Sequence, residues 1–287
     1  MKAILGAALA ASLGLFASPA LAQNNWNKAT EPFHVIDNIY YVGTEGLGAY
    51  LFTGKEGHVL LDGATPEGAA VIKANIAKLG FKLSDVKILL NSHAHFDHSG
   101  GLADLKAATD ATLQAMEGDV SALEGGFYLG SEDVKTMGAP PVKVDRVLKD
   151  GDKVELPGIT LVAHATPGHS RGCTSWGTTA SAGGANYDVL VFCSATVAAN
   201  RITSPLQYDG IVEDYRTTFA KAKTMRVDIP LAPHPEFFGL LQKAEKAKAD
   251  KTQNFFVDPG AFQPYIKRLE EAFETTLKQR TEAAKAN

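Results

Sequence analysis

The chain of 287 residues has little cysteine, little net charge and few long apolar runs. Its formal net charge is −4 and no run of like charges occurs, so there is no basic field to attract nucleic acid. Beyond the N-terminal segment, no stretch is apolar for long enough to cross a membrane. Hydrophobic residues nevertheless make up 45%, which is enough for a substantial core. These properties predict a soluble globular protein with no nucleic-acid partner.

The N-terminus has the pattern of an export signal. Lys2 precedes an apolar run at residues 4–16, and residues 20–22 form a small-x-small cleavage site. We expect a signal peptide at 1–22 and a mature single domain at 23–287, delivered to the periplasm with no membrane attachment. The alternative is an uncleaved anchor, which the well-formed cleavage site disfavours.

The two cysteines, Cys173 and Cys193, are expected to form a disulfide. Residues 173–179 and 189–193 have strand character, and the small polar segment 181–186 predicts a turn between them. The two thiols then fall opposite one another in a hairpin, and export places them in an oxidising compartment. Two buried free thiols are the alternative.

The order of expected elements predicts an α+β sandwich. Strand patterns occur at 39–42, 49–52, 58–61, 86–90, 142–147, 153–156, 159–164, 173–179, 189–193 and 227–231, and helical patterns at 65–80, 99–108, 211–225 and 264–277. Strands followed by helices occur twice, in two similar halves at about 31–158 and 159–287. This order predicts two sheets packed face to face with helices outside.

The richest chemical pattern is at residues 91–101, where three histidines and an aspartate follow a buried strand as H-x-H-x-D-H. Neutral imidazole is the commonest protein metal ligand, and a carboxylate can complete a zinc shell. Chance clustering of surface His and Asp is the alternative. Because the four residues come directly after the apolar run at 86–90, the sequence predicts a metal site.

Two further histidines, His169 and His234, each follow a strand in a turn fixed by glycine or proline. With the four residues of the pattern they make six ligands, too many for one tetrahedral zinc but suitable for two open sites. His93 and His95 are two apart and can reach one ion from an extended backbone. We therefore expect two zinc ions per chain, and the division of their ligands is His93, His95 and His169 at one ion and Asp97, His98 and His234 at the other.

This combination resembles the metallo-β-lactamase superfamily, and the resemblance extends over nearly all of the mature chain. It implies an αββα sandwich and assigns Asp62 the task of supporting a ligand histidine from behind. Many hydrolases of the superfamily place a bridging aspartate where this chain has Ser194. With His98 beside Asp97 and no ligand at Ser194, the sequence is similar to the third subclass of metallo-β-lactamases.

The resemblance implies that the protein is an enzyme that hydrolyses the β-lactam amide of penicillins, cephalosporins and carbapenems with zinc-activated water. Asp97 is then both a ligand and the catalytic carboxylate, and Ser194 and Thr196 bind the substrate carboxylate. We expect a monomer with a small-molecule substrate. A lactonase or thioesterase of the same fold, or a zinc-binding protein without catalysis, are the alternatives. Phe127 and Tyr128, in the long loop 125–141, either cover the apolar side of the substrate or only pack within that loop.

Overall fold

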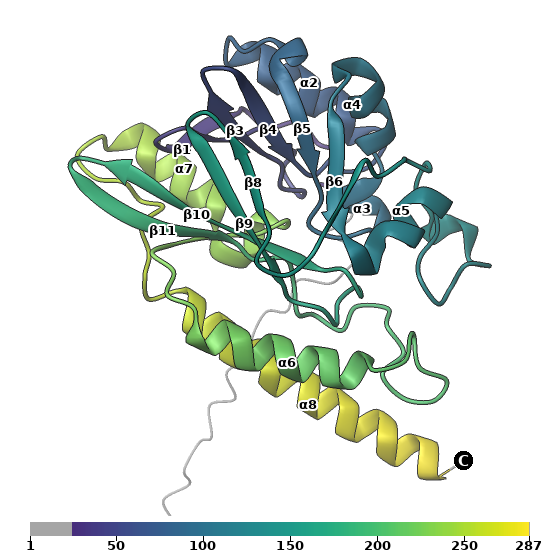
Figure 1. Cartoon of the computed structure of the whole chain (residues 1–287). Helices are drawn as coiled ribbons and strands as arrows, with labels where there is room; N and C mark the ends of the chain where they lie inside the picture. Colours follow the sequence, from purple (N-terminus) through teal and green to yellow (C-terminus); the bar gives the residue numbers. More distant parts are fainter. Residues whose placement is uncertain (1–24, 287) are drawn as a thin grey trace, which may run out of the picture.

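The computed structural model describes residues 25–286, so the expected signal peptide and its cleavage site lie outside the described residues. Two β-sheets pack face to face, and helices cover the outer side of each sheet (Figure 1). This is the αββα arrangement of class α+β, and it confirms the fold expected from the sequence. No helix among the described residues is long and apolar enough to span a membrane.

The first sheet has seven strands in the order β1 to β7. β1 to β4 form an antiparallel meander, whereas β4 to β7 run parallel to one another. The strands are β1 Phe33–Ile36, β2 Ile39–Tyr41, β3 Tyr50–Gly54, β4 Gly57–Leu61, β5 Val86–Leu90, β6 Thr112–Met116 and β7 Arg146–Leu148. β4 and β5 lie at the centre with both faces covered, which explains their nearly continuous apolar sequences.

The second sheet has five strands in the order β12-β11-β10-β9-β8. They are β8 Lys153–Leu156, β9 Ile159–Ala165, β10 Thr174–Ala182, β11 Ala185–Val191 and β12 Ile229–Leu231. The β10–β11 turn is shorter than the segment 181–186 expected from the sequence, because it consists of Gly183 and Gly184 alone. Both glycines have positive φ, as a two-residue hairpin turn of this hand requires.

Most helices form the two outer layers, whereas the helix at Leu240–Ala249 packs on the core between the sheets through Leu240 and Ala244. The helices are α2 Gly68–Lys78, α3 Phe96–Ser99, α4 Leu102–Thr109, α5 Val120–Gly125, α6 Ile211–Thr224, α7 Leu240–Ala249 and α8 Phe262–Ala286, with short 3-10 turns η1 Leu83–Asp85, η2 Glu117–Asp119, η3 Lys135–Met137 and η4 Pro235–Phe238. α2 and α4 lie on the outer side of the first sheet, and α6 and α8 lie together below the second (Figure 1).

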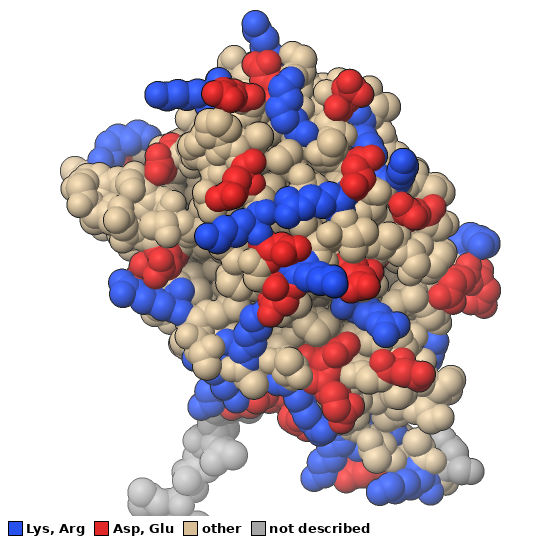
Figure 2. Space-filling view, viewed as in Figure 1, with Lys and Arg blue, Asp and Glu red and all other residues tan. Residues whose placement is uncertain are grey.

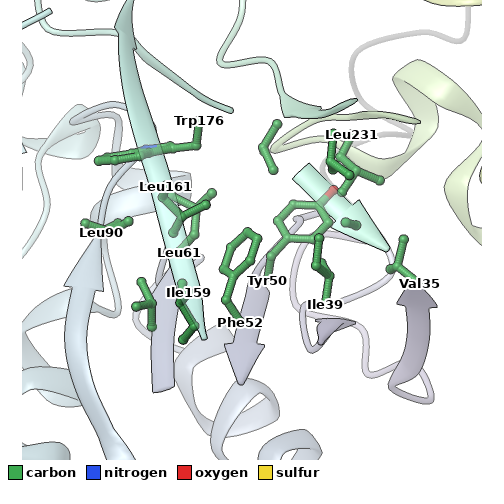
Figure 3. Packing of buried hydrophobic residues seen from close by; sticks show 14 of the residues in the cluster. Val35, Ile39, Tyr50, Phe52, Leu61, Leu90, Ile159, Leu161, Trp176 and Leu231 are labelled. Carbon is green, nitrogen blue, oxygen red and sulfur yellow. The ribbon is translucent and has the colours of Figure 1, made fainter. Parts of the chain in front are cut away.

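The central core lies between the two sheets, and Figure 3 shows its side chains meeting there. Phe52 and Leu61 come from the first sheet, and Leu161 and Trp176 from the second. Trp176 is 1% exposed, so truncation to alanine would cost about 3–5 kcal/mol. This layer holds the two sheets in one relative position.

Charged side chains of both signs are interspersed over the face of the molecule that Figure 2 presents. Two ion pairs, Lys223–Glu270 at 2.7 Å and Arg216–Glu274 at 3.2 Å, join α6 to α8. Such exposed pairs contribute only about 0.2–1 kcal/mol each. The contact between these helices therefore depends mainly on buried aromatic rings from each helix.

Two expectations about single elements were wrong. The helix expected at 99–108 is divided at Gly100 and Gly101 into α3 and α4, so Asp97 and His98 lie inside a short helix rather than before one. A Cβ on Gly101 would come within 2.2 Å of the Gly63 carbonyl oxygen, which shows how closely the two turns approach.

The strand expected at 142–147 is confined to β7 at Arg146–Leu148. The alternation in the sequence is real, since Val142 and Val144 are both buried. Their backbone amides, however, bond to the Leu123 carbonyl and the Glu124 side chain instead of a neighbouring strand. Two strands and two helices whose sequences show no strong hydrophobic periodicity were not predicted: β1, β6, α5 and α7.

Candidate metal centre

All six predicted ligands lie at one end of the sandwich, on loops from both sheets. Two follow β5, two lie in α3, one lies between β9 and β10, and one follows β12: His93, His95, Asp97, His98, His169 and His234. Their candidate ligand atoms form the two triads predicted from the sequence, with all atoms of a triad within 4.8 Å of one another. The sandwich therefore brings together residues that are up to 141 positions apart, from 93 to 234.

The first triad consists of His93, His95 and His169, whose ring centroids are 4.6–4.7 Å apart. His169 Nδ1 lies 2.7 Å from the Thr196 carbonyl oxygen, so this nitrogen carries the proton and donates it. His93 Nδ1 lies 3.0 Å from the Ser92 hydroxyl, and its Nε2 is buried without a hydrogen-bond partner. An imidazole binds a metal through a ring nitrogen that carries no proton, and Nε2 of His93 and of His169 is available for this. Imidazole nitrogen is also a ligand that suits zinc.

The second triad consists of Asp97, His98 and His234. The Nε2 atoms of the two histidines are 3.2 Å apart, and Asp97 Oδ2 lies 3.2 Å from one and 3.5 Å from the other. Zinc bonds of about 2.0–2.2 Å place two ligands of a tetrahedral ion about 3.3–3.6 Å apart. The three atoms thus already have the spacing of ligands around a single ion, and the residues fit zinc.

The electrostatics of the first triad and of Asp97 favour metal-binding protonation states, whereas the pKa of His98 is raised, because the charge and hydrogen bond of Asp97 outweigh the effect of burial. Burial lowers the pKa of His93, and it lowers the pKa of His169 to about 4. Both imidazoles are therefore neutral near pH 7, as ligation requires. Burial alone would raise the pKa of Asp97, but the charge of His98 and hydrogen bonds from His234 and His98 hold it well below its usual value. Asp97 is accordingly a carboxylate.

Asp62 lies behind the second triad, directly after β4. Its Oδ1 accepts hydrogen bonds from the Ser92 backbone amide at 2.6 Å and the Asn91 side chain at 3.1 Å. Its Oδ2 lies 3.9 Å from His98 Nδ1, close enough for electrostatic attraction but too far for a hydrogen bond. Burial raises the pKa of Asp62 to about 6. The structure thus places this carboxylate behind His98, and its support of a ligand histidine, which the family resemblance implies, stays a prediction.

Cys173 and Cys193 form a disulfide, which the sequence also predicted. The Cys193 sulfur lies 3.7 Å from His93 Nδ1, on the side of that ring opposite its free Nε2. The disulfide therefore packs behind the first triad rather than supplying a ligand.

The predicted substrate-binding residues lie on the segment after β11. Ser194 is 2% exposed, and its hydroxyl lies 3.2 Å from the hydroxyl of the half-exposed Thr196. Thr196 has a further part in the site, because its carbonyl oxygen accepts the His169 hydrogen bond. Substrate binding by the two hydroxyls stays a prediction.

Tyr128, expected either over the substrate or within its own loop, packs flat against a ligand. Its ring is stacked on His95 with centroids 4.4 Å apart, and its hydroxyl donates to Asn200 Oδ1 at 2.8 Å. Phe127 is half-buried in the layer beneath α2 and α4. The base of the loop is held by Gln207, whose side-chain amide donates to the Leu129 carbonyl at 2.6 Å. Tyr128 thus supports the first triad from one side.

Sequence reasoning missed two buried polar residues that support the first triad. Asp119 accepts hydrogen bonds from backbone amides and a hydroxyl next to the ligands. Asn200 donates to the His169 carbonyl at 2.9 Å and to the Tyr215 hydroxyl at 3.1 Å. Neither residue belongs to a recognisable local pattern, and only the folded chain brings them to the ligands.

The three remaining histidines lie outside both triads, as expected. His34 is exposed, His58 is buried, and His164 is half-buried. His164 lines a hollow of about 650 Å³ against β9, β10 and β11. This hollow contains none of the six predicted ligands, so its size does not mark the chemical site.

The sheets, the helices and the paired triads define a protein of the metallo-β-lactamase fold. Residues 49–179 match the family model described as the metallo-beta-lactamase superfamily. The chain is 49% identical to BJP-1, a subclass B3 metallo-β-lactamase of Bradyrhizobium japonicum, over 92% of this chain and 99% of that one, with a TM-score of 0.89. It is 38% identical to the native FEZ-1 metallo-β-lactamase of Legionella gormanii over 88% of this chain and 98% of that one, with a TM-score of 0.84. The chain belongs to the metallo-β-lactamase superfamily.

A second group of relatives is similar over a shorter region. The chain is 32% identical to the hydroxyacylglutathione hydrolase of Hyphomonas neptunium over 108 residues, which are 38% of this chain and 34% of that protein. The chain thus spans about a third of the length of the curated relatives it matches. These relatives agree with the superfamily and leave the substrate to be argued from the site.

Proposed function

We propose that this protein hydrolyses the amide bond of β-lactams at a two-zinc centre, and that it acts in the periplasm after export. The observation that carries the proposal is the second triad, in which His98 and His234 meet Asp97 at hydrogen-bonding distances. No cysteine or bridging carboxylate is needed to complete it. Similarity to the subclass B3 metallo-β-lactamase BJP-1 and to the FEZ-1 metallo-β-lactamase, over most of the length of each, supports the same conclusion.

Zinc, when bound, supplies Lewis acidity and lowers the pKa of water, which provides a nucleophile near neutral pH. The chain's own residues set the charge and the orientation of the ligands. Asp97, kept ionised by its neighbours, contributes the negative charge of the second triad. The Thr196 carbonyl fixes the proton of His169 on Nδ1, so that Nε2 stays available. These contacts organise the ligands before any substrate arrives.

Substrate recognition is assigned to the segment after β11. Thr196 is half-exposed and its hydroxyl lies 3.2 Å from His169 Nδ1, which places it at the edge of the first triad. Ser194 supports that hydroxyl from the buried side. A β-lactam carries a carboxylate, and a hydroxyl at this edge can donate a hydrogen bond to it.

The experiment is a direct assay of the mature protein with zinc against a penicillin, a cephalosporin and a carbapenem, with and without a chelator. We expect hydrolysis that the chelator abolishes and that zinc restores. A hydroxyacylglutathione thioester serves as the competing substrate, because the shorter relatives are hydroxyacylglutathione hydrolases. Turnover of the thioester with no β-lactam hydrolysis would overturn the proposal, and zinc binding without any turnover would indicate a non-catalytic protein.

A further inference from the structure

Asp119 is a buried carboxylate that makes three hydrogen bonds, all to neighbours of one metal triad. It lies at the end of η2 and is 2% exposed. Its Oδ2 accepts from the Ala94 amide at 2.8 Å and the Ser170 hydroxyl at 2.7 Å, and its Oδ1 accepts from the Gly172 amide at 2.7 Å. All its bonds therefore join it to the two loops that carry the first triad.

The positions of these partners are specific. Ala94 lies between His93 and His95 in the chain, and Ser170 follows His169 directly. One carboxylate thus bonds to a residue adjacent to every ligand of the first triad. Within residues 25–286, its side chain makes no hydrogen bond to Asp97, to His234 or to the residues next to them.

The segment that carries Asp119 also touches the His169 loop through its backbone. A Cβ on Gly118 would lie 2.5 Å from the Arg171 carbonyl oxygen, and a Cβ on Gly172 would lie 2.4 Å from the Asp119 amide nitrogen. Only glycine permits that approach at either position. The contact joins the segment after β6, in the first sheet, to the loop between β9 and β10, in the second.

The geometry points to Asp119 as a positioning residue that sets the distance between the His93–His95 loop and the His169 loop, and so sets zinc affinity at the first triad alone. Because the ligand set comes from two different sheets, some contact must hold the loops in one relative position when no ion does so. This inference rests on the assignment of the first triad as a zinc site. Loss of such a supporting contact typically weakens metal binding about 10–100-fold.

The test measures zinc affinity by competition with a chromophoric chelator in two backgrounds. His98→Ala removes a ligand of the second triad and leaves the first, whereas His169→Ala removes a ligand of the first and leaves the second. We expect Asp119→Asn to weaken zinc binding about 10–100-fold in the His98→Ala background and by less than about threefold in the His169→Ala background. Equal weakening in both backgrounds, or none in the first, would overturn the inference.

Two further variants separate positioning from charge and from folding. Ser170→Ala removes one donor to Asp119 and keeps the carboxylate, so it should weaken the first site alone by a smaller factor; no change would count against positioning, even if Asp119→Asn did not fold. Asp228→Asn is the matched control, since Asp228 Oδ2 accepts from the Asp188 amide at 2.9 Å far from the triads and should leave zinc affinity unchanged. If the parent protein bound no zinc, or if either background bound none, the zinc assignment itself would fail.

Discussion

Replacing Asn200 by alanine should loosen the support of the first triad and destabilise the fold. Asn200 is 1% exposed, and its amide group makes four hydrogen bonds. Its Oδ1 accepts from the Tyr128 hydroxyl, and its Nδ2 donates to the Gly168 and His169 carbonyls and to the Tyr215 hydroxyl. Alanine removes all four bonds at once.

The expected loss in the free energy of unfolding depends on which partners of Asn200 lose their only hydrogen bond. The Tyr215 hydroxyl still donates to the Thr196 carbonyl at 2.9 Å, so it remains satisfied. The Tyr128 hydroxyl and the His169 carbonyl lose their partner in a buried setting, at about 1–3 kcal/mol each, and the Gly168 carbonyl loses a longer bond of 3.3 Å. We therefore expect Asn200→Ala to lower the free energy of unfolding by about 3–5 kcal/mol. Tyr128→Phe, which removes one hydroxyl, should cost about 1–2 kcal/mol.

The assay is urea unfolding of chelator-treated protein, followed by tryptophan fluorescence, for the two single variants and the double variant. Because both single changes break the same Tyr128–Asn200 bond, the cost of the double variant should fall short of the sum by at least about 0.5 kcal/mol. Additivity to within about 0.3 kcal/mol would show that the two residues act independently and would refute the reasoning that Asn200 holds Tyr128 in place through this bond.

Three other changes test separate parts of the structure. His98→Ala should reduce bound zinc from two ions to one and sharply reduce turnover, and an unchanged metal content by mass spectrometry would refute its assignment as a ligand. Replacing both Cys173 and Cys193 by serine opens a loop with a sequence separation of 20 and should lower stability by about 3 kcal/mol in urea unfolding under oxidising conditions; equal stability would contradict this. Gly101→Ala should cost about 1–3 kcal/mol because its Cβ meets backbone, whereas the control Gly260→Ala, with no atom within 4 Å, should cost less than about 1 kcal/mol; thermal melting compares the two.

Sequence patterns predicted elements well where the signal is local. The run 86–90 is apolar at almost every position and forms β5, and 153–156 alternates and forms β8. β6 was missed because its buried side chains include Gln114 beside Ala115, so no apolar run or clear alternation marks it. The segment 142–145 shows the opposite failure: its alternating valines are buried, but their amides bond to Leu123 and Glu124 of α5 and not to a strand. Hydrophobic periodicity indicates which side chains are buried. Whether the segment forms a strand depends also on the hydrogen-bonding groups that lie beside its backbone.

The grouping of the candidate ligands into two triads was predictable because three separate signals agree: residue type, spacing and position at strand ends. The residues that hold the ligands were not predictable in the same way. Asp119, Asn200 and Tyr128 reach their partners across sequence separations of 15 to 72 residues, and nothing in their own neighbourhoods distinguishes them from ordinary loop residues. Such residues become visible only when the path of the chain is known.

Two hydrogen bonds connect the metal centre to the core of the sandwich. Trp176, in the second sheet, donates its indole N–H to the carbonyl of Asn91 at the start of the ligand loop, at 3.2 Å. Tyr50, in the first sheet, donates its hydroxyl to the carbonyl of Ala232, two residues before His234, at 2.6 Å. The polar ends of two core aromatic side chains thus fix each sheet against the ligand-bearing segment of the other. A core substitution that lets the sheets shift should therefore separate the ligands, and weaken zinc binding, before it unfolds the protein.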